Sequence, residues 1–424
     1  MRTDAGWIAV VMFCIVLLPS YAHADVKYTV QSGDTLAKIA SHYFPLAESY
    51  TKSEFIAQIK KLNNLGAKGI SQGLVLTVPM VRTEPLKPVS VKKSRGFEAK
   101  GVYANQWTAG TRQVLNISER IKKIGGNTLV FDAKEVQGLP TYKSSVPRQY
   151  LSLSSYPSSI DDIPRLVDYL HKRGIHVVAR VCVFRDIHNS SINAQWRFYK
   201  EWVNPANKAV QDYNLAIIRE LIGFGVDEIQ VDYFRYPTDG KADTGIAGKV
   251  RSDVLADYAR RIRELTSSKG VLLSLDMFGI VIWQKDEDIK TLGQDVMKLK
   301  HHFDIISPML YPSHFPKGFS NEKNPADKPY YFVNRGITRM KALVGDEVTI
   351  RPWLQSFPLR ITTGYNSAYV KAQIKGAQDA GAVGWLLWSP GNHYEEAYRA
   401  MVDMAGQEKA SAVNTTPAKQ QENH

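Results

Sequence analysis

Eight short apolar runs recur along residues 101–405, and stretches with the apolar spacing of helices lie between them. Strands built from these runs, which are rich in β-branched and aromatic residues, are expected at 101–107, 128–133, 176–183, 228–233, 271–278, 304–311, 349–355 and 384–388. The clearest helix is 161–173, which has one apolar face and ends at Gly174. Eight such units predict an α/β protein with a (β/α)8 TIM barrel, which commonly needs about 250 residues plus insertions. An open doubly wound sheet is the alternative, but no glycine-rich phosphate loop follows the first strand.

A shorter pattern occupies residues 27–80. Strand-like residues lead into a turn at 32–34, where Asp34 or Thr35 can cap a helix that runs to about residue 42. A second helix is expected around 54–62, and residues 73–79 read as a closing strand. The pattern predicts a small βααβ domain ahead of the barrel.

Three further segments complete the organisation. Residues 1–24 combine Arg2, an apolar run at 7–18 and the small residues around Ala24, which is the pattern of a secretory signal peptide. The run is short for a membrane span, although an uncleaved anchor is the alternative. Residues 81–100 are a basic, proline-containing linker, and 406–424 a polar tail that is expected to be disordered.

These segments predict an exported protein, located in the periplasm, in the cell wall or outside the cell, with no stable membrane span after cleavage. Cys182 is then the only cysteine left, so no internal disulfide can form. The formal net charge is +13, which suits an anionic partner such as the cell envelope. Nucleic acid is the other explanation of a basic chain, but the charge is spread thinly and no nucleic-acid-binding motif is found, so no nucleic-acid partner is expected.

The small domain resembles LysM domains in three runs, which read Val-Gln-Ser-Gly-Asp-Thr-Leu at 30–36, Leu-Asn-Asn at 62–64 and Leu-Thr-Val-Pro at 76–79. The resemblance implies binding of glycans that contain N-acetylglucosamine, usually peptidoglycan or chitin. It implies a sugar groove formed by Gly33, Asp34, Thr35 and the stretch that begins at Asn64. The helix–helix connection at 44–53 looks longer than is typical of these domains.

Two aspartates stand where neighbouring barrel strands are expected to end. Alternation along the fourth strand places Asp232 on the face opposite Tyr233, with Arg235 close enough to keep the carboxylate ionised. Asp276 closes the fifth apolar run ahead of a glycine turn. Because barrel strands end at one face, both carboxylates can flank a substrate, as glycoside hydrolysis requires. A structural Asp–Arg pair and a helix cap are the alternatives for the two residues.

Other polar and aromatic residues follow the remaining strands. On the second strand, Asp132, Lys134 and Glu135 are candidates for positioning the substrate, or for a structural ion pair. Aromatic faces at such a rim can stack on sugar rings, although any single Trp is more often part of a core. The further candidates for substrate binding are Arg180, Arg235, Tyr311, His314, Trp353, Gln355 and Trp388.

Four motifs, at 131–135, 227–237, 307–314 and 351–355, resemble the bacterial family described as "putative glycosyl hydrolase domain", a distant relative of the α-amylase-like barrels. The resemblance implies a (β/α)8 fold, a nucleophile-like aspartate at Asp232 and a second acid after the fifth strand. Asp276 stands where amylases usually have Glu, and Ser356 stands where relatives often have an acid, so Asp132 or Glu135 would have to substitute for a third carboxylate.

The sequence therefore predicts a glycoside hydrolase that acts on envelope or extracellular polysaccharide and is targeted to it by the LysM-like module. The alternative is a non-catalytic glycan-binding or scaffold protein with a degenerate barrel. A metal-dependent deacetylase or esterase is disfavoured, because the ten histidines are scattered and no Gly-x-Ser-x-Gly motif occurs. Neither a metal nor a cofactor is expected.

Overall fold

The structure is a computed structural model that describes residues 25–66, 69–80, 82–86, 89, 91, 94–238 and 250–414. The chain divides into two compact units, Met1–Pro85 and Leu86–His424. The expected signal peptide, residues 1–24, lies outside the described residues.

The first unit has the expected βααβ order. Its elements are β1 (Val26–Thr29), α1 (Leu36–Tyr43), the 3-10 turn η1 (Phe44–Leu46), α2 (Lys52–Leu62) and β2 (Val75–Val78), and the two strands pair antiparallel. Thr35 caps α1 by accepting a hydrogen bond from Lys38 N, and Thr51 and Glu54 form a capping box on α2. Both helices bury an apolar stripe against the strands, with Ile39, Phe55, Ile59, Leu76 and Val78 at the centre.

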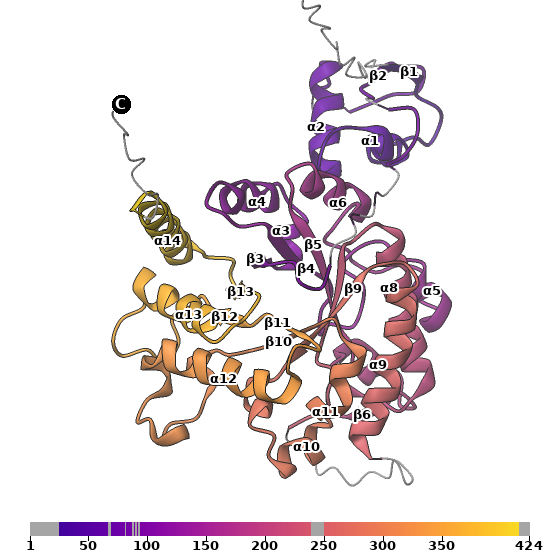
Figure 1. Cartoon of the computed structure of the whole chain (residues 1–424). Coiled ribbons are helices and arrows are strands. Elements are labelled where there is room, and N and C mark those ends of the chain that lie inside the picture. Colours follow the sequence, from indigo (N-terminus) through magenta and orange to yellow (C-terminus); the bar gives the residue numbers. More distant parts are fainter. Residues whose placement is uncertain are drawn as a thin grey trace, which may run out of the picture. The chain divides into compact units, whose positions relative to one another are not determined.

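The second unit is a closed parallel barrel, so the prediction of a (β/α)8 fold is confirmed (Figure 1). Its strands are β3 (Ala99–Ala104), β4 (Thr128–Lys134), β5 (His176–Cys182), β8 (Glu228–Asp232), β9 (Leu272–Met277), β10 (Ile305–Pro308), the divided strand β11 (Thr349–Ile350) and β12 (Trp353–Gln355), and β13 (Gly384–Trp388). Pro352 interrupts the seventh strand, because proline cannot donate a ladder hydrogen bond. β11 still pairs with β10, and β12 with β13, which in turn pairs with β3 and closes the ring.

Helices surround the strands in Figure 1. They are α3 (Gln106–Ala109), α4 (Gln113–Lys123), α5 (Val146–Leu151), α6 (Ile163–His171), α8 (Lys208–Gly223), α9 (Arg251–Ser267), α10 (Asp286–Leu292), α11 (Val296–Leu299), α12 (Pro329–Val344), α13 (Ser367–Asp379) and α14 (Glu395–Asn414). On α6, the apolar face that the sequence predicted is buried, and Asp162 caps the helix by accepting from Arg165 N. An insertion after β5 adds α7 (Ile187–Ile192) and a hairpin of β6 (Arg197–Tyr199) and β7 (Trp202–Val203).

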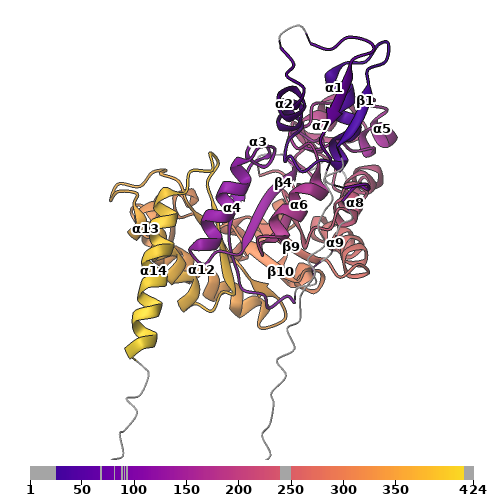
Figure 2. The ribbon, with the colours of Figure 1, turned by 90° about the horizontal axis from the view of Figure 1, so that it is seen from above.

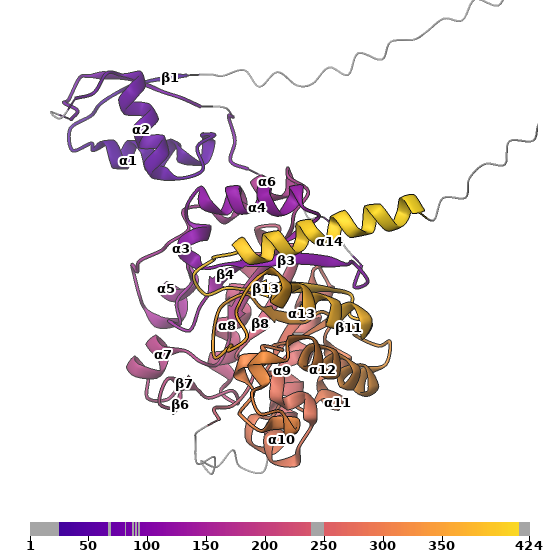
Figure 3. The same cartoon turned by 90° about the vertical axis from the view of Figure 1, so that its left-hand side faces the viewer.

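The last helix corrects one expectation. We expected disorder from Gly406 onward, but α14 continues to Asn414, and Figures 2 and 3 show its C-terminal half extending away from the barrel. Residues 415–424 lie outside the described residues. Within the part of the chain that is described, no helix combines the length and the apolar character needed to span a membrane.

Charged side chains, as well as apolar ones, fill the barrel interior. Glu228 on β8 accepts hydrogen bonds from Arg351, Ser274 and His176, which project from other strands. Burial alone would raise the pKa of Glu228, but the charge of Arg351 and the bond from His176 overcome it and lower the pKa to about 2. This buried cluster ties β5, β8, β9 and the seventh strand together below the site.

Candidate active site

A pocket of about 270 Å³ opens where the barrel strands end. Barrel enzymes place their chemistry at this face. Eight of the residues singled out in the sequence line the pocket, namely Arg180, Asp232, Arg235, Asp276, Tyr311, His314, Trp353 and Trp388. Strands far apart in the sequence therefore bring most of the expected site together.

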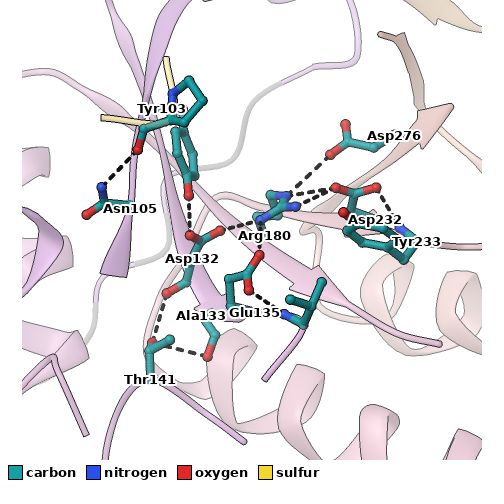
Figure 4. A network of polar contacts seen from close by, with 12 residues as sticks. Tyr103, Asn105, Asp132, Ala133, Glu135, Thr141, Arg180, Asp232, Tyr233 and Asp276 are labelled. Carbon is teal, nitrogen blue, oxygen red and sulfur yellow. Dashed lines mark hydrogen bonds and ion pairs between the residues drawn. The ribbon is translucent and has the colours of Figure 1, made fainter. Parts of the chain in front are cut away.

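Arg180, on β5, lies at the centre of the charged groups (Figure 4). Its guanidinium donates from Nη1 to Asp132 Oδ1 at 2.5 Å, and from Nε and Nη2 to Asp232 Oδ2 at 3.0 and 2.6 Å. Nη1 also lies 3.7 Å from Glu135 Oε1, and Nε lies 3.9 Å from Asp276 Oδ2. One buried cation thus faces four carboxylates from three strand ends.

Asp232 is held from both sides. Oδ2 accepts the two bonds from Arg180, while Oδ1 accepts from the backbone N–H of Tyr233 at 2.5 Å. We expected Arg235 beside Asp232, but the structure pairs Asp232 with Arg180. The guanidinium of Arg235 packs instead over the rings of Trp202 and Phe278.

Asp276 has a different environment. Its Oδ1 accepts a 2.6 Å hydrogen bond from Trp353 Nε1, and the residue is 2 % exposed. Burial, and then the nearby charge of Asp232, raise the pKa of Asp276 well above its usual value, although Arg180 and Trp353 act in the opposite direction. Both Oδ2 atoms lie within 4 Å of Arg180 Nε, so the two carboxylates are less than about 7 Å apart.

Asp132 and Glu135 contact Arg180 rather than the pocket. Asp132 accepts hydrogen bonds from Arg180 and from the Tyr103 hydroxyl, and it is 1 % exposed. Burial is the main cause that raises the pKa of Asp132 to about 6, against the lowering effect of Arg180. Both carboxylates contact Arg180 and are not among the residues that line the pocket, and their role in positioning substrate remains a prediction.

Lys134 and Gln355 also have structural contacts. Lys134 is fully buried, and its Nζ lies 2.7 Å from the carbonyl of Cys182 and 3.0 Å from Asp186. Gln355 donates to the Phe357 carbonyl and accepts from Ser313 N. Neither residue is among those that line the pocket, and their roles in substrate binding remain predictions.

Aromatic rings form the apolar wall. Trp388 stacks on Tyr103 with centroids 3.9 Å apart, and the guanidinium of Arg180 lies 5.0 Å from the Trp388 centroid. Trp388 is half-buried, whereas Trp353 is almost fully buried. Burial, helped by Arg360, lowers the pKa of His314, so this ring is neutral at pH 7.

The sequence did not single out six further lining residues, which are Tyr233, Phe278, Gly279, Ile280, Met309 and Phe315. Strand alternation placed Tyr233 opposite Asp232, but β8 ends at Asp232 and Tyr233 has φ +50°, which turns its ring to the pocket. A Cβ at Gly279 would lie 2.2 Å from the Met309 carbonyl oxygen, so this position requires glycine. The glycine directly after Phe278 is therefore a sequence signal for this part of the pocket wall.

In the small unit, the four expected glycan-binding residues build turns. Asp34 accepts hydrogen bonds from the Tyr28 hydroxyl and from Gln31 N, and Thr35 caps α1. Gly33 and Asn64 have positive φ of 79° and 51°. Their contact with glycan remains a prediction.

Comparison with known proteins agrees with the two units. A LysM domain model matches residues 28–79. An S-layer-related protein of Niallia circulans is 24% identical over 30% of this chain, and the match spans only 10% of that protein. Among solved structures, the PgaB (BpsB) glycoside hydrolase domain of Bordetella bronchiseptica shares the fold, at 14% identity and TM-score 0.55 over 73% of this chain and 99% of that one. The spore cortex-lytic enzyme SleL of Bacillus cereus matches at 13% identity and TM-score 0.46, over 89% of this chain and 86% of its own.

The second unit is matched by a family model over residues 101–394, which covers all eight barrel strands from Gly101 onward. Both resemblances recognised in the sequence are thereby confirmed. The chain belongs to the family described as "putative glycosyl hydrolase domain" and carries a LysM domain ahead of it.

Proposed function

We propose that the chain is an exported glycoside hydrolase that cleaves an envelope glycan containing N-acetylglucosamine, with Asp276 and Asp232 as its catalytic pair. The observation that supports this most is a pair of buried carboxylates less than about 7 Å apart, of which one has a strongly raised pKa. Glycosidic cleavage pairs a carboxyl group that donates a proton with a second carboxylate, and the raised pKa of Asp276 suits it to the first role.

Asp276 would be the general acid. Its raised pKa keeps the carboxyl group protonated at pH values where an ordinary aspartate is ionised, so it can give its proton to the leaving glycosidic oxygen. Trp353 Nε1 holds Oδ1, which leaves Oδ2 for the proton transfer.

Asp232 would be the nucleophile or the base. The two hydrogen bonds from Arg180 and the one from Tyr233 N keep the carboxylate in one orientation toward the pocket that it lines. It would then either attack the anomeric carbon or take a proton from the attacking water. Carboxyl separations of about 5 to 5.5 Å belong to the first route and about 6.5 to 9.5 Å to the second.

The LysM unit would raise the local concentration of the barrel at its substrate. Tethering converts the second binding event into an intramolecular one, which strengthens association without new contacts in the pocket. LysM domains bind glycans that contain N-acetylglucosamine, which supports peptidoglycan, or another N-acetylglucosamine polymer, as the partner.

The test measures new reducing ends from purified peptidoglycan, chitin oligomers, and α- and β-glucans. The protein would start at Asp25, and Asp232→Asn would be compared with Asp346→Asn, a matched change at an exposed carboxylate. Release by the wild type and by Asp346→Asn, with kcat at least about 100-fold lower in Asp232→Asn, would support the proposal. Proton NMR of the first product anomer would then separate the nucleophile from the base role.

A second candidate is a glycan-binding scaffold without turnover. It is favoured by the hydrogen bonds that occupy both oxygens of Asp232, and by Ser356 at the end of the seventh strand. Pelleting with peptidoglycan in the absence of any released reducing ends would support this candidate instead.

A further inference from the structure

Tyr311 brings a hydroxyl group to the catalytic pocket that the protein itself does not pair. The residue follows β10, lines the pocket and is only 5 % exposed. Among the residues that the structure describes, none donates a hydrogen bond to this hydroxyl or accepts one from it. Buried polar groups in proteins are normally paired, so the Tyr311 hydroxyl is a candidate for pairing with a ligand.

Other tyrosine hydroxyls near the site do have protein partners. Tyr103 donates to the carboxylate of Asp132, and Tyr394 donates to the Tyr103 carbonyl at 2.6 Å. Both of these hydroxyls hold parts of the barrel together. The hydroxyl of Tyr311 has no such structural task.

The ring of Tyr311 is held in place before any ligand arrives. It packs edge-to-face against His314 and Phe357, with centroids 5.1 and 5.8 Å away. Its carbonyl accepts from His314 N at 2.9 Å, and Pro312 begins a 3-10 turn directly after it. A group that is fixed in advance loses little conformational freedom on binding, so its hydrogen bond contributes more fully to affinity.

The electrostatic surroundings keep this hydroxyl a donor. Burial, and then the negative charges of Asp276 and Asp232, raise the pKa of Tyr311 well above its usual value, so the proton stays on the oxygen. The three residues line the same pocket. The anomeric carbon of a bound sugar would lie between the two carboxylates, and the C2 substituent is carried by the ring carbon next to it.

Apolar side chains complete this part of the pocket. Met309 packs against the cluster that contains Tyr311 and Trp353, and Met309 and Ile280 both line the pocket. An acetamido group on C2 presents a carbonyl oxygen and a methyl group, which suit a fixed donor beside an apolar wall. A C2 hydroxyl has no methyl group to place against this wall, and a C2 ammonium has no acceptor for the tyrosine proton.

We propose that the Tyr311 hydroxyl donates a hydrogen bond to the acetamido carbonyl on C2 of the sugar held between Asp232 and Asp276. The assignment of this sugar to the cleaved bond rests on the proposed function. Tyr311 is then a specificity-determining residue, through which the barrel itself selects N-acetylated units independently of the LysM unit.

Tryptophan fluorescence measures binding to the barrel alone. Residues 25–106 contain no tryptophan, so the LysM unit is silent, whereas Trp353 and Trp388 line the pocket. The protein would start at Asp25 and carry Asp276→Asn to prevent turnover, since asparagine keeps an acceptor for Trp353 Nε1.

Three trimers of the same linkage are the probes, and they differ only in the group on C2. They are the chitin trimer, its fully de-N-acetylated form and the cellulose trimer, which carry acetamido, ammonium and hydroxyl groups. Tyr311→Phe removes the hydroxyl and retains the ring. Tyr330→Phe is the matched control, because Tyr330 is 41 % exposed on α12 and donates to Asp379, away from the residues that line the pocket.

The expected result is that the N-acetylated trimer binds more tightly than the other two, and that Tyr311→Phe weakens its binding about three- to tenfold without weakening theirs. The preference among the trimers requires no change at Tyr311, so it tests the proposal even where that variant does not fold. Equal affinities for the three trimers, no fluorescence change with any of them, or equal affinities of Tyr311→Phe and Tyr330→Phe for the N-acetylated trimer would overturn this inference.

A failure of the proposed function would look different. Reducing ends released by the wild type, together with equal affinities for the three trimers, would uphold the proposed function and remove the role of Tyr311. A preference for the N-acetylated trimer that is lost in Tyr311→Phe, without release of reducing ends from any glycan, would refute that function and leave the role of Tyr311 in binding.

Discussion

Trp353 Nε1 donates a 2.6 Å hydrogen bond to Asp276 Oδ1, although β12 and β9 are not neighbours and β10 lies between them in the ring. The bond therefore crosses the mouth of the barrel, inside the site. It gives one oxygen of the candidate acid a defined partner, and it favours the ionised form, since a donor to a carboxylate stabilises the charge.

Trp353→Phe should raise the pKa of Asp276 further. The indole donor lowers this pKa, so its loss leaves burial and the charge of Asp232 with less opposition. An acid that must be protonated to act would then stay active at higher pH, and the alkaline limb of the kcat/KM profile should move upward. An unchanged limb, in a variant whose unfolding temperature remains near that of the wild type, would argue against Asp276 as the acid.

Arg180→Met should destabilise the barrel by about 3 to 5 kcal/mol near neutral pH. The change leaves Asp132, Asp232 and Asp276 buried without their shared cation, which is more costly than the loss of an exposed pair. The deficit should shrink as the pH falls, because burial raises the pKa values of Asp132 and Asp276, so these two groups bind protons in the folded state at higher pH than in the unfolded chain. Urea unfolding from pH 4 to 8 measures this, and Lys341→Met should change stability by less than about 1 kcal/mol.

Because of Asp132, the free energy of unfolding of the wild type should fall as the pH rises. Its folded pKa of about 6 lies above the ordinary value of 3.8, so its contribution to stability is fully present below about pH 4 and is lost as the pH passes through 6. The loss is on the order of 3 kcal/mol. The difference between the free energies of unfolding of wild type and Asp132→Asn should change by about that amount between pH 4 and pH 7. A difference that stays constant would contradict the raised pKa of Asp132.

Trp388→Ala should raise KM about five- to tenfold with a smaller effect on kcat. The half-buried ring lines the pocket and is held by stacking on Tyr103, so it offers a fixed face to a sugar ring. Trp107→Ala is the matched control, because Trp107 is 68 % exposed and is not among the residues that line the pocket. Steady-state kinetics on the glycan that is cleaved would show the difference, and equal KM values in both variants would exclude Trp388 as a sugar platform.

The expected site residues that line the pocket share one property, which is their position at or near the end of an apolar run. Asp232, Asp276, Arg180 and Trp388 each stand at or near such an end, and parallel strands in a ring deliver their ends to one face. The fold, the LysM unit and eight of the lining residues followed from this rule together with the motifs.

The sequence could not predict which partner each charged side chain would find across the ring. Alternation said that Asp232 faces inward, but it could not say that Arg180 rather than Arg235 would reach it. Lys134 was grouped with Asp132 by its spacing, yet its Nζ turns to Asp186 and the Cys182 carbonyl. Tyr233 does not follow the inward–outward alternation of the strand, because its positive φ ends the extended backbone on which that pattern depends.

The sequence by itself determined the order of elements, the closed barrel and the strand ends at which carboxylates gather, because hydrophobic periodicity and motif spacing are local properties of the chain. Only the tertiary structure decided which carboxylates share Arg180, and that burial raises the pKa of Asp276 well above its usual value. Those features depend on burial and on distances between side chains far apart in sequence, and burial and distance set both pKa values and ion pairing.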